Sequence, residues 1–84
     1  MSKSHHPLPH FTPDMHRAEV MEVLYDICIQ SGYLVTVSEF SAYCTVPGKR
    51  SFLICFESDR AAARFAQTHN LSVFGYSGVL LAVN

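Results

Sequence analysis

The period of the hydrophobic pattern changes twice between residues 47 and 83, and this change constrains the fold more than any other feature of the chain. Turn residues at 47–49 precede a stretch, 51–56, with a large apolar residue at every second position, the period of a strand with one buried face. From 58 to 70 the apolar residues recur at helical spacing, with Ser58 as the expected N-cap and Asn70 as the expected end of the helix. The apolar run at 79–83 again indicates a strand. This order predicts half of an α+β sandwich.

The first half of the chain predicts a helix over residues 12–31. Thr12 suits the N-cap position, Pro13 suits the first helical position, and Asp14 favours the positive end of a helix. Gly32 is the residue type that ends helices in the left-handed conformation. We expect this helix to pack on a sheet through a broad apolar face that includes Ala18, Met21, Leu24, Tyr25 and Cys28.

Between the two helices, alternation predicts strands at 33–37 and 40–46 in addition to 51–56. The sequence leaves open whether residues 33–46 form two strands or one long bent strand. Residues 71–74 are a short strand or a docking segment.

The chain has 84 residues, enough for a single domain. We expect a flexible arm containing histidine and proline at residues 1–11 and one α+β domain at residues 12–84. The domain is predicted to be a two-layer sandwich, with two helices on an antiparallel sheet in the order α-β-β-β-α-β. The predicted core consists of apolar residues from both helices and the strands: Val20, Leu24, Ile27, Val35, Phe52, Ile54, Phe56, Ala62, Phe65, Leu81 and Val83.

This order resembles a ferredoxin-like fold without its first strand, and residues 49–83 resemble the second half of an RNA-recognition-motif domain. The segment 49–56 (KRSFLICF) matches the position of that family's basic–aromatic motif, and 70–83 matches its last loop and strand. The resemblance implies the fold and a nucleic-acid-binding sheet face. The family places stacking aromatic residues on that face, whereas the outward positions of residues 51–56 here are Ser, Leu and Cys.

Several classes of function find little support in the residues. The net charge is −1, and no phosphate-binding loop or hydrolase motif occurs, so we expect neither an enzyme nor a cofactor. Cys28, Cys44 and Cys55 have no CxxC spacing and are expected to be buried thiols in a reducing cytoplasm. We expect no signal peptide, and no apolar run is long enough to span a bilayer.

Histidines gather near the start of the chain, at His5, His6, His10 and His16. Imidazole is a common metal ligand, but no cysteine or carboxylate shares this spacing. We therefore expect a solvated tail and no metal site, with a histidine metal site as the alternative.

Two binding functions remain. An open edge of the sheet would accept a protein strand or form a homodimer, with exposed tyrosines as anchors: Tyr33, Tyr43 and Tyr76. We therefore expect a small non-enzymatic binding protein, an adaptor or an inhibitor of the kind that phages use against host machinery.

The alternative is a weak binder of single-stranded nucleic acid, resembling an RNA-recognition motif. Its phosphate contacts would come from four cations: Lys49, Arg50, Arg60 and Arg64.

Overall fold

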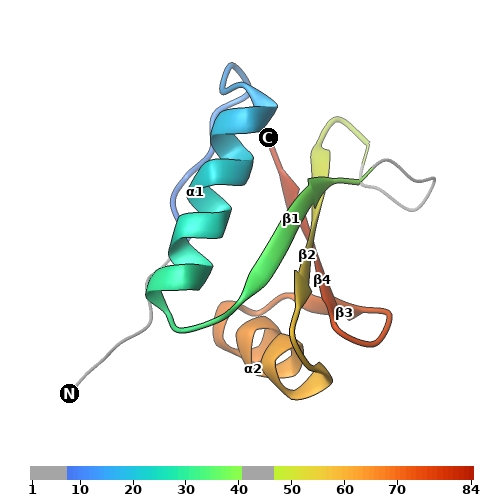
Figure 1. The fold of residues 1–84 in the computed structure, drawn as a ribbon. Helices are drawn as coiled ribbons and strands as arrows, with labels where there is room; N and C mark the ends of the chain where they lie inside the picture. The colour runs from blue at the N-terminus through green and yellow to red at the C-terminus, as the bar shows by residue number, and fades with distance from the viewer. Residues whose placement is uncertain (1–7, 41–46) are drawn as a thin grey trace.

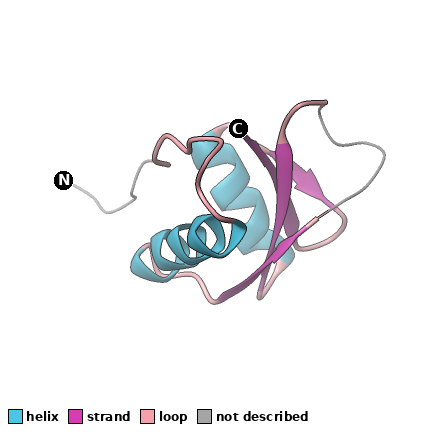
Figure 2. Cartoon of the chain, turned by 90° about the horizontal axis from the view of Figure 1, so that it is seen from above, coloured by secondary structure: helices cyan, strands magenta, loops and turns pink. Residues whose placement is uncertain are grey.

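The computed structural model describes residues 8–40 and 47–84 (Figure 1). The elements follow one another as α1 (Arg17–Gln30), β1 (Val35–Glu39), β2 (Arg50–Phe56), α2 (Asp59–His69), β3 (Ser72–Phe74) and β4 (Gly78–Val83). The four strands form one antiparallel sheet in the order β1-β2-β4-β3, so β1 and β3 are its edges. Both helices lie on the same side of this sheet (Figure 2). The predicted α+β class, with two helices on an antiparallel sheet, is confirmed.

The strands differ in detail from the prediction. β1 begins at Val35 and ends at Glu39, slightly later than the predicted 33–37. Most of the strand expected at 40–46 lies outside the described residues. The segment left open as a strand or docking segment forms β3, a three-residue edge strand paired with β4.

The core lies between the helices and the central strands β2 and β4. Phe52 and Ile54 are fully buried, and they pair with Leu81 and Val79 of β4 on the same face of the sheet. Most of the predicted core is therefore buried as expected, whereas Ile27 and Val35 are only half-buried. The core also contains residues absent from the prediction: Phe11, Cys28, Ala66 and Val79.

The start of α1 differs from the prediction. The first helical residue is Arg17, and the N-cap is His16, whose Nδ1 accepts a hydrogen bond from the Ala18 N–H at 3.1 Å. The Thr12 hydroxyl instead donates to the Asp14 carboxylate at 2.6 Å, which lowers the Asp14 pKa. Thr12 therefore stabilises a turn that precedes the helix.

The segment before α1 belongs to the packed domain. Phe11 is buried in the core, and Leu8 packs against the core. Residues 8–11 were expected in the flexible arm, but Phe11 is buried in the core, which places the boundary before this residue. Its burial is favourable because moving an apolar ring out of water lowers the free energy. Residues 1–7 of the predicted arm lie outside the described residues.

The predicted ends of the helices are otherwise found in the structure. Gly32 has a φ of +93°, and the Tyr33 N–H donates to the Cys28 carbonyl at 2.9 Å, which closes the end of α1. At the start of α2, the Ser58 hydroxyl accepts from the Ala61 N–H at 3.1 Å. α2 ends at His69, and its C-cap, Asn70, adopts the left-handed conformation.

Candidate interaction surface at strand β1

Strand β1 is an edge of the sheet, and half of its backbone groups have no partner among residues 8–40 and 47–84. The Phe40 N–H donates to the Ser51 carbonyl at 2.8 Å, in register with the ladder between β1 and β2. In an antiparallel ladder every second residue points its N–H and C=O towards the same neighbour. Val35, Val37 and Glu39 therefore point these groups away from β2, towards an edge where no other described strand lies.

A groove lies where α1 meets this edge. Its volume is about 470 Å³, larger than the other two hollows described below. We call it the α1 groove, and it is lined by Arg17, Ala18, Met21, Glu22, Tyr25 and Val37. Its lining is largely apolar, so the groove offers a hydrophobic site directly beside free backbone donors and acceptors.

Two of the apolar stripes of α1 differ in burial. One stripe consists of Val20, Leu24 and Cys28, which are spaced by four residues and fully buried. The second lies about a quarter-turn around the helix and remains partly or largely exposed: Ala18, Met21, Tyr25 and Ile29.

The second stripe was not recognised from the sequence as a separate surface, because Ala18, Met21 and Tyr25 were grouped with the core-facing residues. Tyr25 is 45% exposed and Ile29 is 38% exposed. The sequence does indicate this second surface, because the apolar face of α1 is too broad to pack entirely on one sheet.

Further exposed groups flank this surface. Leu34, which immediately precedes β1, is 69% exposed. The Arg17 Nε lies 3.9 Å from the Glu39 Oε1, and both side chains are largely in solvent. Such an exposed pair contributes little to stability, so both groups remain available to a partner.

Two of the three predicted tyrosine anchors are among the described residues, and they differ in exposure. Tyr33 packs edge-on against Phe56 and Phe65, with ring centroids 5.3 and 5.8 Å away, and burial raises its pKa. It therefore belongs mainly to the margin of the core. Tyr76 is 87% exposed in the turn between β3 and β4, and Tyr43 lies outside the described residues.

Arg50, one of the predicted nucleic-acid contacts, is occupied by backbone carbonyl groups. Its guanidinium donates to the main-chain oxygens of Thr12, Met15 and Asn84 at 2.5–3.1 Å. These bonds fix the segment before α1 and the end of β4 to the start of β2. The Arg50 side chain therefore has a structural role in the fold.

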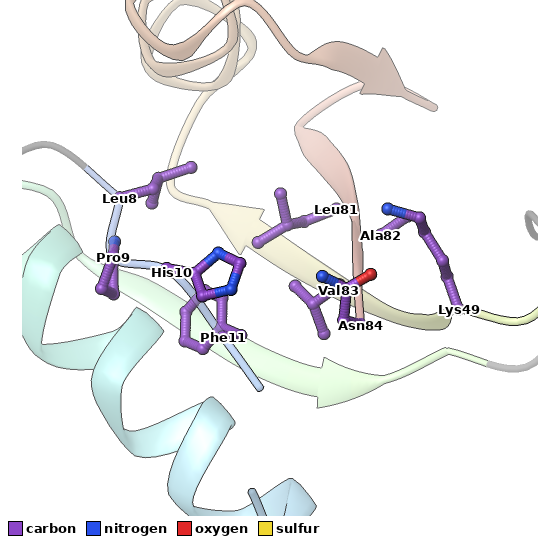
Figure 3. Close-up of a pocket in the computed structure, with 9 residues that line it drawn as sticks. All are labelled: Leu8, Pro9, His10, Phe11, Lys49, Leu81, Ala82, Val83 and Asn84. Atoms are coloured by element: carbon purple, nitrogen blue, oxygen red, sulfur yellow. The ribbon is translucent and has the colours of Figure 1, made fainter. Parts of the chain in front are cut away.

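The other three cations lie at two ends of strand β2. Lys49 precedes β2 and lines a hollow of about 180 Å³ between the N-terminal segment and β4 (Figure 3). Arg60 and Arg64 are on α2, beyond the other end of β2, and line a hollow of about 220 Å³ with Tyr33. A seven-residue strand is about 20 Å long, so these cations do not form a compact cluster.

The sheet face opposite the helices, the outer face, is mainly apolar. The rings of Phe40 and Phe74 are in contact there, with centroids 5.0 Å apart. Leu53 also lies on this face, where its side chain packs close to Gly78 of β4. None of the described strand residues on the outer face is charged.

Cys28 is buried, and desolvation raises its pKa to about 12, so its thiol is protonated at neutral pH. Within residues 8–40 and 47–84, no group of three His, Cys, Asp or Glu side chains is placed to hold a metal ion. No helix in these ranges is long and apolar enough to cross a membrane.

Comparison of the chain with protein-family models, with curated proteins and with solved structures gave no match.

Proposed function

We propose that this protein is a small non-enzymatic protein-binding domain that accepts an extended strand at the β1 edge. It would act by occupying its partner, as an adaptor or an inhibitor. Inhibitors that phages use against host machinery are one class of small protein that works in this way. A reducing cytoplasm is the expected compartment because Cys28 is a buried free thiol.

One observation carries this proposal: the free backbone of β1 and the apolar α1 groove lie side by side. Val37 belongs to both, because its N–H and C=O point outwards while its side chain lines the groove. In strand addition, the main chain of the bound segment pairs with the edge strand. Alternate side chains of the bound segment enter pockets and provide specificity. The β1 edge has both components.

The opposite edge of the sheet is a poorer site for strand addition. β3 contains only three residues, Ser72–Phe74, and a very short edge strand offers few hydrogen bonds to a partner. β1 is longer, with five residues, and it is flanked by the exposed Leu34 side chain. The β1 edge is therefore the binding surface that we propose.

A weak nucleic-acid binder remains the second candidate, and the pair of rings at Phe40 and Phe74 favours it. Aromatic side chains on a sheet face can stack on bases. Phosphate binding also requires nearby cations, and Lys49 is separated by the length of β2 from Arg60 and Arg64. Arg50 already donates to three carbonyl groups, so the cationic part of this candidate is weak.

Capture from cell lysate, with and without nuclease, tests the proposal when two tyrosine variants are compared. Tyr25→Ser removes an aromatic ring from the α1 groove, whereas Tyr76→Ser makes the same change in the turn between β3 and β4. We expect a retained protein that survives nuclease, and we expect Tyr25→Ser to reduce its recovery about tenfold or more. Tyr76→Ser should leave recovery unchanged.

Two results would count against this proposal. Loss of the retained material on nuclease treatment would favour the nucleic-acid candidate, with Lys49, Arg60 and Arg64 as the residues to replace. Equal recovery with Tyr25→Ser and with the unmodified chain would move the binding surface away from the α1 groove.

A further inference from the structure

We propose that the strand added at the β1 edge is β1 of a second copy of this chain, paired antiparallel about a two-fold axis at Val37. This inference rests on the proposed strand-addition function and names the partner. The evidence lies in the hydrogen-bonding groups of β1 and in the side chains that a symmetric pairing brings together.

The backbone of β1 favours one symmetric register. Val35, Val37 and Glu39 carry the outward N–H and C=O groups. With the axis at Val37, this residue faces its own counterpart, and Val35 faces Glu39 of the second copy. In each such pair the two residues exchange both backbone hydrogen bonds. Moving the axis by one residue in either direction leaves only two of the three residues paired within β1.

The same register matches side chains on the outer face of the sheet. Thr36 faces Ser38 of the second copy, and the two hydroxyl groups can form a cross-strand hydrogen bond. One pair further along, the exposed Leu34 faces Phe40 of the second copy, so an apolar side chain with 69% exposure gains an apolar neighbour. Every pair on this face therefore joins side chains of the same kind.

Charge also fits this register. Glu39 is the only charged residue of β1, and it faces Val35 of the second copy. The two Glu39 carboxylates then lie at opposite ends of the pairing, each beside the Arg17 of its own copy at 3.9 Å. A register centred nearer to Glu39 would bring these like charges together, which is unfavourable.

On the helix side of the sheet, the symmetric pairing also brings the α1 grooves of the two copies together. A two-fold axis perpendicular to an antiparallel pair keeps both helix layers on the same face, because directly opposed residues share a face. Val37 of each copy then points towards the α1 groove, beside Met21 and Tyr25. The residues of the second stripe that line the groove, Ala18, Met21 and Tyr25, then face the two-fold axis and are covered.

The experiment that tests this inference is analytical ultracentrifugation of the full chain over a wide concentration range, with two double variants. Thr36→Lys with Ser38→Lys places like charges opposite one another twice in the proposed pairing. Thr36→Lys with Ser38→Glu places opposite charges there. Both positions are exposed in the single copy, so circular dichroism should show the same fold for both variants.

We expect the unmodified chain to sediment at twice the monomer mass. We also expect the dimer dissociation constant of the Lys/Lys variant to be roughly tenfold higher than that of the Lys/Glu variant. Monomers at all concentrations, or a dimer that does not distinguish the two variants, would overturn the inference.

The two proposals can fail separately. A monomeric chain from which Tyr25→Ser removes a captured protein would reject the symmetric dimer while leaving strand addition intact. A dimer that responds to the charge pattern would support strand addition at the β1 edge, with the second copy as the added strand.

Discussion

Helices α1 and α2 pack on the same sheet, but they use their apolar residues differently. α2 has one apolar stripe, Ala62, Phe65 and Ala66, and all three residues are buried. Its remaining surface is polar or carries small alanines. α1 buries Val20 and Leu24 but exposes a second stripe that includes Tyr25. The sheet of a single copy therefore buries the whole apolar stripe of α2 but only part of the apolar surface of α1.

This difference supports the interface that we propose. A helix with one apolar stripe is fully accommodated by one packing layer, whereas a second stripe becomes stabilising only when another surface covers it. In this protein the second stripe lies beside an edge strand with free backbone groups at Val35, Val37 and Glu39. The second stripe of α1 and the outward backbone groups of β1 therefore both support the proposed interface.

The largest expected effect is on the α2 side of this comparison. Phe65 is 1% exposed and its ring lies 5.1 Å from that of Phe56, so Phe65→Ala should reduce the free energy of unfolding by about 3–5 kcal/mol. Tyr25→Ala on α1 should cost less than about 1 kcal/mol in the single copy. Urea unfolding of both variants at low concentration measures this contrast. Equal losses would mean that Tyr25 belongs to the core.

A smaller loss is expected at Arg50, which ties the segment before α1 to β2 and β4. Arg50→Ala removes the donors to the main-chain oxygens of Thr12, Met15 and Asn84, and should lower the free energy of unfolding by roughly 1.5–3 kcal/mol. The exposed Arg60 of α2 is the matched control, and its replacement by alanine should change stability by less than about 0.5 kcal/mol. Similar values for the two variants would contradict the structural role of Arg50.

Because Cys28 lies in the buried stripe of α1, the stability of the protein should fall at alkaline pH. Its pKa is raised from 9.0 to about 12 by burial, so the unfolded chain loses this proton at lower pH than the folded chain does. The stabilisation is complete below pH 9 and is lost as the pH rises towards 12. We expect the melting temperature to fall over this window, with a shallower fall in Cys28→Ala. Parallel curves would show that Cys28 ionises equally in both states.

The smallest effect concerns the beginnings of the two helices. α2 begins with Ser58, a favoured N-cap, whereas α1 begins with His16. His16→Asp should stabilise the protein by about 0.5–1 kcal/mol, because a carboxylate accepts from the backbone N–H groups and complements the positive helix end. Ser58→Ala should destabilise it by about 1 kcal/mol. Thermal unfolding at pH 7 measures both changes, and a loss of stability in His16→Asp would be the opposite of this expectation.

Features set by nearby residues were predictable from the sequence. The alternation at Phe52, Ile54 and Phe56 defined β2, and Ser58 and Asn70 defined the ends of α2, because each signal acts within a few residues. The resulting α+β class followed from these local signals.

Features set by distant residues were not predictable. Thr12 does not begin α1, and its carbonyl accepts from Arg50, which is 38 residues away in the chain. Phe11 is buried only because the core provides space for it. The α1 groove likewise depends on the position of α1 beside β1, which the helical period alone does not determine. The candidate surface therefore emerged from tertiary structure, although its apolar residues were visible in the sequence.

Amide hydrogen exchange along β1, measured residue by residue with NMR, tests most directly whether this edge accepts a strand. In the dilute chain, the amides of Thr36, Ser38 and Phe40 should be protected by β2, and those of Val37 and Glu39 should exchange rapidly. We predict that Val37 and Glu39 become protected at high protein concentration, as the second copy pairs with them, or in a complex with a captured protein. Rapid exchange at Val37 and Glu39 under both conditions would contradict strand addition at β1.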